Sequence, residues 1–153
     1  MPEQAEETRN VICKYLSYKY QLKDGSFRFI KLPLVHVRLT STESAFESVA
    51  LVDSGATQTL IPLELAEILE LQYEKKKVET VGAGGIFQSL IAKLKVFEIM
   101  KNGTPFSIFR DTTVLVPESK DVLPYVILGR DHIFRRFDIT FHERREKIAF
   151  TKV

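Results

Sequence analysis

The sequence is poor in cysteine, histidine and net charge, and each shortage excludes a class of protein. Its single cysteine, Cys13, cannot form an internal disulfide, so the chain is not a disulfide-stapled secreted domain. The 22 basic and 20 acidic residues leave a formal net charge of only +2, too small to indicate a nucleic-acid or membrane partner. No apolar run approaches the length of a membrane span, and the polar, acidic start MPEQAEETRN does not fit a signal peptide. We therefore expect a soluble cytoplasmic protein.

The sequence gives little support for a metal site or for a catalytic nucleophile. His36, His132 and His142 are far apart, and Cys13 has no partner at ligand spacing, so we expect no metal site and no cofactor. His36 falls in the polar phase of an alternating segment and is interpreted as a surface residue. Ser54 does not lie in a G-x-S-x-G turn, which argues against a serine hydrolase.

What the sequence has in abundance is alternation of apolar and polar residues at period two, which is typical of half-buried strands. The pairs Asp24-Gly25 and Asn102-Gly103 lie between strand-like runs (11–22 and 27–39; 86–100 and 105–116) and predict hairpin turns. Residues 142–145 predict a third turn, between 137–141 and 147–151. We expect a single mainly β domain over residues 32–153, with an N-terminal extension, residues 1–31, that adds a β-hairpin.

Helical signals are confined to two short segments. Residues 62–70 begin with a proline, which suits a first helical turn, and place Leu63, Ala66 and Ile68–Leu69 near one face. The second candidate starts at Asp131, a good N-cap residue, and ends at Arg135–Arg136, where cations suit the helix dipole. The fold should therefore contain one or two short helices.

Three motifs carry the functional prediction. In L-V-D-S-G-A-T, residues 51–57, an apolar strand runs directly into a carboxylate and a Ser-Gly turn. The cluster V-G-A-G-G-I, residues 81–86, lacks the spacing of a phosphate-binding loop and lies between two strand-like runs, which favours a mobile hairpin tip. In V-I-L-G-R-D, residues 126–131, a second apolar strand ends at a glycine and leads into the short helix.

Together, the three motifs resemble the retropepsin-like aspartic proteases in order and rough spacing. The segment A-L-V-D-S-G-A-T followed by T-L-I-P is similar to the active-site segment, the glycine hairpin to the flap, and V-I-L-G-R-D to the segment that lies beside the active-site loop. The resemblance covers roughly residue 34 to the C-terminus and is strongest to the small cellular, single-domain members. It implies a retropepsin-like acid-protease barrel with a flap hairpin.

The resemblance also assigns roles to particular residues, each of which is an expectation at this point. The catalytic set comprises Asp53, Ser54 and Gly55. Substrate contacts are expected from the rest of the active-site loop and from the flap tip, namely Ala56, Thr57, Gly82, Ala83, Gly84 and Gly85. Structural support of the site is expected from Gly129, Arg130 and Asp131.

Aspartic proteolysis needs two carboxylates, and the sequence supplies only one copy of the motif. Residues 24–26 have the wrong order and read as a turn, while Asp111-Thr112-Thr113 lacks the glycine. Counting therefore predicts a symmetric homodimer in which each chain gives one Asp53, acting on a peptide or unfolded-protein substrate. In the family, chain ends interleave into a dimer sheet, and the strand-like run 147–153 could serve here.

One departure from the family pattern leaves a second hypothesis open. Position 57 is Thr, where viral members often carry an Asp that pairs with the downstream arginine, so Arg130 lacks that partner. The alternative to a peptidase is a dimeric peptide-binding or assembly module on the same fold, with little or no turnover.

Overall fold

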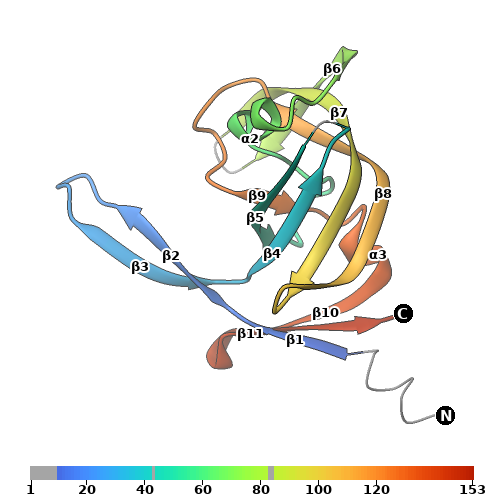
Figure 1. Ribbon diagram of the computed structural model, residues 1–153. Coiled ribbons are helices and arrows are strands. Elements are labelled where there is room, and N and C mark those ends of the chain that lie inside the picture. The colour runs from blue at the N-terminus through green and yellow to red at the C-terminus, as the bar shows by residue number, and fades with distance from the viewer. Residues whose placement is uncertain (1–9, 43, 83–84) are drawn as a thin grey trace.

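The computed structural model describes residues 10–42, 44–82 and 85–153, and in this part of the chain strands dominate (Figure 1). The strands are β1 (Asn10–Lys14), β2 (Leu16–Gln21), β3 (Phe27–Leu32), β4 (Leu34–Thr40), β5 (Ala45–Val52), β6 (Tyr73–Gly82), β7 (Gly85–Lys101), β8 (Thr104–Pro117), β9 (Val126–Leu128), β10 (Phe137–His142) and β11 (Lys147–Lys152). Two short helices, α2 (Leu63–Ile68) and α3 (Ile133–Arg136), and a 3-10 turn, η1 (Glu143–Arg145), complete the described elements. The predicted mainly β architecture is confirmed.

The largest sheet is organised around the long strand β7. Its first half pairs with β6 and its second half with β4, while β8 follows almost its whole length on another edge. The order then continues from β4 to β5 and to β9. In Figure 1, β7 and β8 bend together around one side of the molecule. The pair β5–β9 is parallel, so two strands end at the same edge of the sheet.

A second sheet joins the two ends of the described chain. Its order is β1-β11-β10, with both pairs antiparallel. The prediction that residues 147–153 form a strand is confirmed by β11, but both edges of β11 are already paired within the chain. A strand from another subunit could extend this sheet only at β1 or β10, so interleaving through β11 itself, as the family pattern suggested, does not fit this topology.

The predicted turns are present, and their chemistry is as expected. Asn102 and Gly103 both have positive φ, 51° and 77°, as a two-residue hairpin turn between β7 and β8 requires. Between β2 and β3, the Asp24 carboxylate accepts hydrogen bonds from the backbone N–H and the hydroxyl of Ser26. The run 11–22 is nevertheless not one strand, because buried Tyr15 separates β1 from β2, which belong to different sheets.

The helices match their predictions only in part. Helix α2 buries Leu65 and Ala66, but the Ile68 side chain is 55% exposed, so its expected place on the buried face is wrong. Helix α3 starts one residue later than predicted, with His132 rather than Asp131 at the N-cap position and no side-chain cap. Both helices are too short to cross a membrane, and no other helix in the described residues is long and apolar enough to do so.

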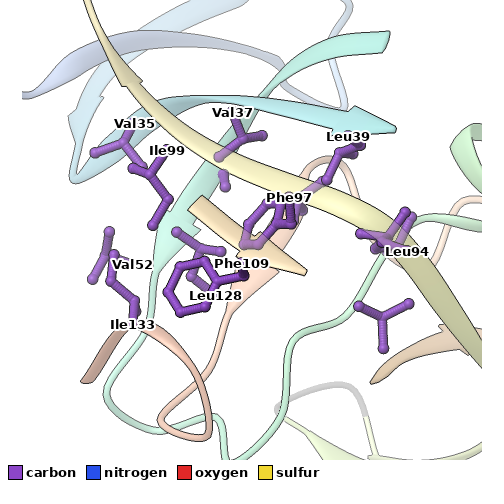
Figure 2. Packing of buried hydrophobic residues seen from close by; sticks show 14 of the residues in the cluster. Val35, Val37, Leu39, Val52, Leu94, Phe97, Ile99, Phe109, Leu128 and Ile133 are labelled. Atoms are coloured by element: carbon purple, nitrogen blue, oxygen red, sulfur yellow. The ribbon is translucent and has the colours of Figure 1, made fainter. Parts of the chain in front are cut away.

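The hydrophobic core lies inside the curved main sheet. Val35, Val37 and Leu39 of β4 meet Phe97 of β7 and Phe109 of β8, and the two phenyl rings stack with centroids 5.8 Å apart (Figure 2). Val52 and Leu128, the last residues of β5 and β9, are buried in the same cluster. Because Val52 and Leu128 are buried in this cluster, the ends of β5 and β9 are held in place.

Phe97→Ala should lower the free energy of unfolding by about 3–5 kcal/mol, because Phe97 is fully buried and its removal leaves a cavity. A matched control is Phe46→Ala on strand β5 of the same sheet, where the side chain is 41% exposed and the cost should be about 1 kcal/mol or less. Chemical denaturation of both variants tests this, and equal losses of stability would contradict the placement of the core.

Candidate active site

The carboxylate of Asp53 is presented where β5 and β9 end side by side. Val52 pairs with Leu128 across these parallel strands, and the Asp53 N–H continues the pairing by donating to the Leu128 carbonyl at 3.1 Å. The Gly55 N–H donates to Asp53 Oδ1 at 2.8 Å, and the Ala56 N–H donates to the Asp53 carbonyl at 3.2 Å. The turn therefore folds back on the half-buried carboxylate and fixes its direction.

The chain that leaves this turn passes between two other strands. Leu60 exchanges two backbone hydrogen bonds with Ile127 of β9, both 2.9 Å. On its other side, the Leu115 N–H of β8 donates to the Thr59 carbonyl, and the Ile61 N–H donates to the Leu115 carbonyl. The loop is thus anchored by backbone groups on both sides and does not depend on a particular side chain.

The segment after β9 closes against the same loop. The N–H groups of Arg130 and Asp131 donate to the carbonyls of Ala56 and Thr57 at 2.9 and 2.8 Å. At Gly129 the approach is so close that a Cβ atom would lie 2.3 Å from the Gln58 carbonyl oxygen. Only glycine can occupy this position without displacing the loop, which gives a physical reason for the glycine in V-I-L-G-R-D.

Arg130 has a partner that the sequence did not reveal. Its Nη2 donates to the hydroxyl of Thr57 at 3.3 Å, and among the described residues it forms no ion pair. Asp131 instead lies 3.8 Å from Arg135 on the exposed side of α3. Thr57 therefore accepts a hydrogen bond from Arg130, but it does not carry the negative charge that an aspartate would have.

A second polar contact ties the loop to α3. Thr59 is fully buried, and its hydroxyl lies 3.1 Å from His132 Nδ1. Burial lowers the pKa of His132; Asp131 acts in the opposite direction, and Arg135 and Arg136 lower it further. Burial thus favours the neutral form of the histidine, which lies against the loop, a role that its sequence context did not indicate.

A cleft of about 270 Å³ opens beside the turn. It is lined by residues 55–58 of the loop, residues 79–81 of β6, and Leu60 and Leu115. The hairpin that joins β6 to β7 carries Gly82 and Gly85 as paired residues at its end, while Ala83 and Gly84 lie outside the described residues. Val81 and Ile86, which flank this end, are among the most exposed apolar residues.

A small apolar cluster borders the same region. Its buried members are Leu60, Leu115 and Ile127, and partly buried apolar side chains pack around them, namely Leu51, Ala56, Val78, Ile91, Leu123 and Tyr125. Burial raises the pKa of Tyr125, and the neighbouring Tyr18 and the charge of Asp53 act in the same direction. The charge of Asp53 therefore acts on Tyr125, which packs against this apolar cluster.

The structure brings together residues from two of the three motifs and places the third opposite them. The turn at residues 53–57 and the segment 129–131 are in direct contact, and the end of β6 faces the turn across the cleft. Sequence reasoning missed Gln58, His132 and Tyr125, which stand in none of the three motifs, and it gave Thr59, the first residue of T-L-I-P, no role of its own. Among the described residues, no group of three or more His, Cys, Asp or Glu side chains could hold a metal ion.

Comparisons with known proteins agree with this geometry. A family model described as aspartyl protease matches residues 37–132, which include the turn, the β6–β7 hairpin and residues 129–131. A crystal structure of a retropepsin-like aspartic protease from Rickettsia conorii is similar in fold, with a TM-score of 0.54 over 94% of this chain and 90% of that chain, at 13% sequence identity. The comparison with curated proteins found no match.

The fold is therefore that of a retropepsin-like acid protease, as predicted. Because the family model spans more than half of the sequence, the chain belongs to the aspartyl protease family.

Gly129→Ala should lower the free energy of unfolding by about 1–3 kcal/mol, because the added methyl group meets the Gln58 backbone and the loop must move. Denaturant unfolding measures the loss. A variant as stable as the wild type would show that the loop is not packed against Gly129 as described.

Stability should fall as the pH is lowered from about 7.5 to 5.5, because the unfolded chain binds a proton at His132 more readily than the folded chain. The stabilising contribution of neutral His132 is complete above the pKa that this histidine has in the unfolded chain. It is lost as the pH falls from that pKa towards the lower pKa of His132 in the folded chain. His132→Gln should reduce this dependence, whereas His36→Gln, at an exposed position, should preserve it. Urea unfolding at several pH values measures both, and an unchanged slope in His132→Gln would contradict the assignment.

Proposed function

We propose that the protein is a homodimeric aspartic endopeptidase that hydrolyses peptide bonds between two Asp53 carboxylates, one from each subunit. The observation that carries the proposal is the position of Asp53 at the end of β5, with one carboxylate oxygen held by the Gly55 N–H and a cleft directly beside the turn. An aspartate with only a structural role would accept hydrogen bonds from its own turn. It would need neither the cleft nor the apolar cluster next to it.

Two chains are required because each supplies a single suitable carboxylate. The family chemistry uses two carboxyl groups about 3 Å apart that share one proton, since two like charges at that distance cannot both be ionised cheaply. In the single chain Ser54 is exposed, on the turn next to Asp53. We infer that the two turns meet on a two-fold axis, where each Ser54 hydroxyl braces the turn of the other subunit.

The reaction follows from this shared proton. The ionised carboxylate accepts a proton from a water molecule, which attacks the carbonyl carbon of the scissile peptide, while the protonated carboxyl group hydrogen-bonds to the carbonyl oxygen. The carboxyl group that accepted the proton from the water then donates it to the amine nitrogen as the C–N bond breaks, and the other carboxyl group, which has protonated the carbonyl oxygen, regains its proton from a hydroxyl of the tetrahedral intermediate as the new carboxylic acid forms.

The proposed substrate is an extended, apolar-flanked peptide or an unfolded protein. One side of the cleft is formed by residues 79–81 of β6, which stands at the end of its sheet order, and addition of an extended peptide to an edge strand is a common binding mode. The cluster around Leu60, Leu115 and Ile127 suits apolar side chains on that peptide. We further propose that the β6–β7 hairpin, with Gly82, Ala83, Gly84 and Gly85, closes over the substrate as a flap. A cytoplasmic location belongs to the same proposal and fits a chain with a single cysteine.

Asp53→Asn should reduce cleavage of an unfolded-protein substrate at least about 100-fold between about pH 3.5 and 7.5, because an amide cannot accept the proton of the attacking water. The dimer should persist, since Asn is nearly isosteric with Asp. Asp111→Asn, at an exposed position of β8, is the matched control and should keep wild-type activity.

Three outcomes separate the hypotheses. Loss of cleavage in Asp53→Asn with an intact dimer supports the peptidase and assigns its catalytic base. Absence of cleavage in the wild type as well, with both proteins dimeric, favours a peptide-binding or assembly module. Full activity in Asp53→Asn would show that Asp53 is not the catalytic group.

A further inference from the structure

Strands β2 and β3 form a hairpin that leaves the body of the molecule, and we call residues 16–32 the arm. Figure 1 shows the arm extending beyond every other described element. It is a separate two-stranded sheet with the register Leu16 to Leu32 through Gln21 to Phe27. It lies outside residues 37–132, which the family model matches.

The arm exposes large apolar side chains that its own chain does not cover. Phe29 is 71% exposed and Phe27 52%, and both lie on the same face because they stand opposite Lys19 and Gln21. Tyr20 and Ile30 are exposed on the other face. Lys19 lies 4.1 Å above the ring of Phe27, within the arm itself. An isolated two-stranded hairpin is marginally stable in water, and exposed aromatic clusters usually mark interfaces.

The base of the arm lies beside the catalytic turn. The Val52 N–H, one residue before Asp53, donates to the carbonyl of Pro33, which directly follows the arm. Tyr18 of the arm meets Tyr125 edge to face, with ring centroids 5.3 Å apart, and Tyr125 is within electrostatic reach of Asp53. If two Asp53 side chains meet on an axis, each arm therefore starts next to the partner subunit.

We propose that the arm packs on the second copy of this chain and that Phe27 and Phe29 are buried in the dimer interface. The inference rests on the proposed function, which places the two-fold axis at Asp53. Each six-residue arm strand spans about 20 Å, so the far end of the arm lies well away from its base beside the turn. The composition agrees, because Tyr, Phe and Arg are enriched in interfaces, and the arm carries Tyr18, Tyr20, Phe27, Arg28 and Phe29. The arm thus adds to the dimer contact beyond the catalytic turns.

Photo-crosslinking of the full chain tests the contact directly. Phe29→p-benzoylphenylalanine should give a covalent dimer on irradiation, whereas the same replacement at Ile68, another exposed apolar residue, on α2, should give none. Exclusive labelling within one chain at Phe29, in a protein that is dimeric, would overturn the proposal.

The double variant Phe27→Ser/Phe29→Ser provides the second measurement. Its dimer dissociation constant, from sedimentation at a series of concentrations, should rise at least about 10-fold, because two aromatic side chains no longer leave water on association. Ile68→Ser should leave that constant unchanged. Unfolding curves check that both variants fold.

The outcomes distinguish the arm from the proposed function. A wild type that is dimeric and active, with an unchanged dissociation constant in the double variant, overturns the role of the arm alone. If the double variant keeps the wild-type dissociation constant but has a raised KM, the arm contacts the peptide instead, which also overturns the proposal. A wild type that is monomeric and inactive at every concentration contradicts the proposed function, and the arm proposal with it.

Discussion

The structure depends on one backbone arrangement, the passage of residues 59–61 between Leu115 of β8 and Ile127 of β9. Hydrogen bonds on both sides hold this segment, and the preceding turn with Asp53 is closed by the Leu128 carbonyl and by the N–H groups of residues 55 and 56. Because the arrangement uses backbone groups, it tolerates much side-chain variation. Its strict requirement is Gly129, where any side chain would collide with Gln58. This is consistent with a shared fold at only 13% sequence identity.

The same arrangement explains how an exposed turn can be rigid. Val52 and Leu128 are buried in the main core, whereas Leu60 and Ile127 belong to the smaller cluster on the cleft side. The turn is therefore fixed between two apolar clusters, with its carboxylate at the boundary with solvent. Catalytic groups need this combination of rigid support and access. The contact between Thr59 and His132 adds a polar tie to the start of α3.

Much of this could be predicted from local patterns, because those patterns have local causes. Alternation identified β4, and Asn102-Gly103 identified the turn between β7 and β8, since the required positive φ values are properties of those residues. Contacts between distant segments were not predictable: the partner of Arg130, the exposure of Ile68 and the break at Tyr15 all depend on tertiary packing. The sequence located the motif that contains Asp53. It did not identify the residues that hold this motif in place, because Gln58 and His132 have no local sequence signature.

The central claim is that catalysis needs an Asp53 from each of two chains. The most direct measurement mixes wild-type and Asp53→Asn chains at fixed total concentration, allows the subunits to exchange, and follows cleavage as the wild-type fraction changes. If both carboxylates are needed, activity follows the square of that fraction, and an equal mixture keeps roughly a quarter of the wild-type rate. Activity that is proportional to the wild-type fraction, with half of the rate left in an equal mixture, would show that one chain suffices and would contradict the account.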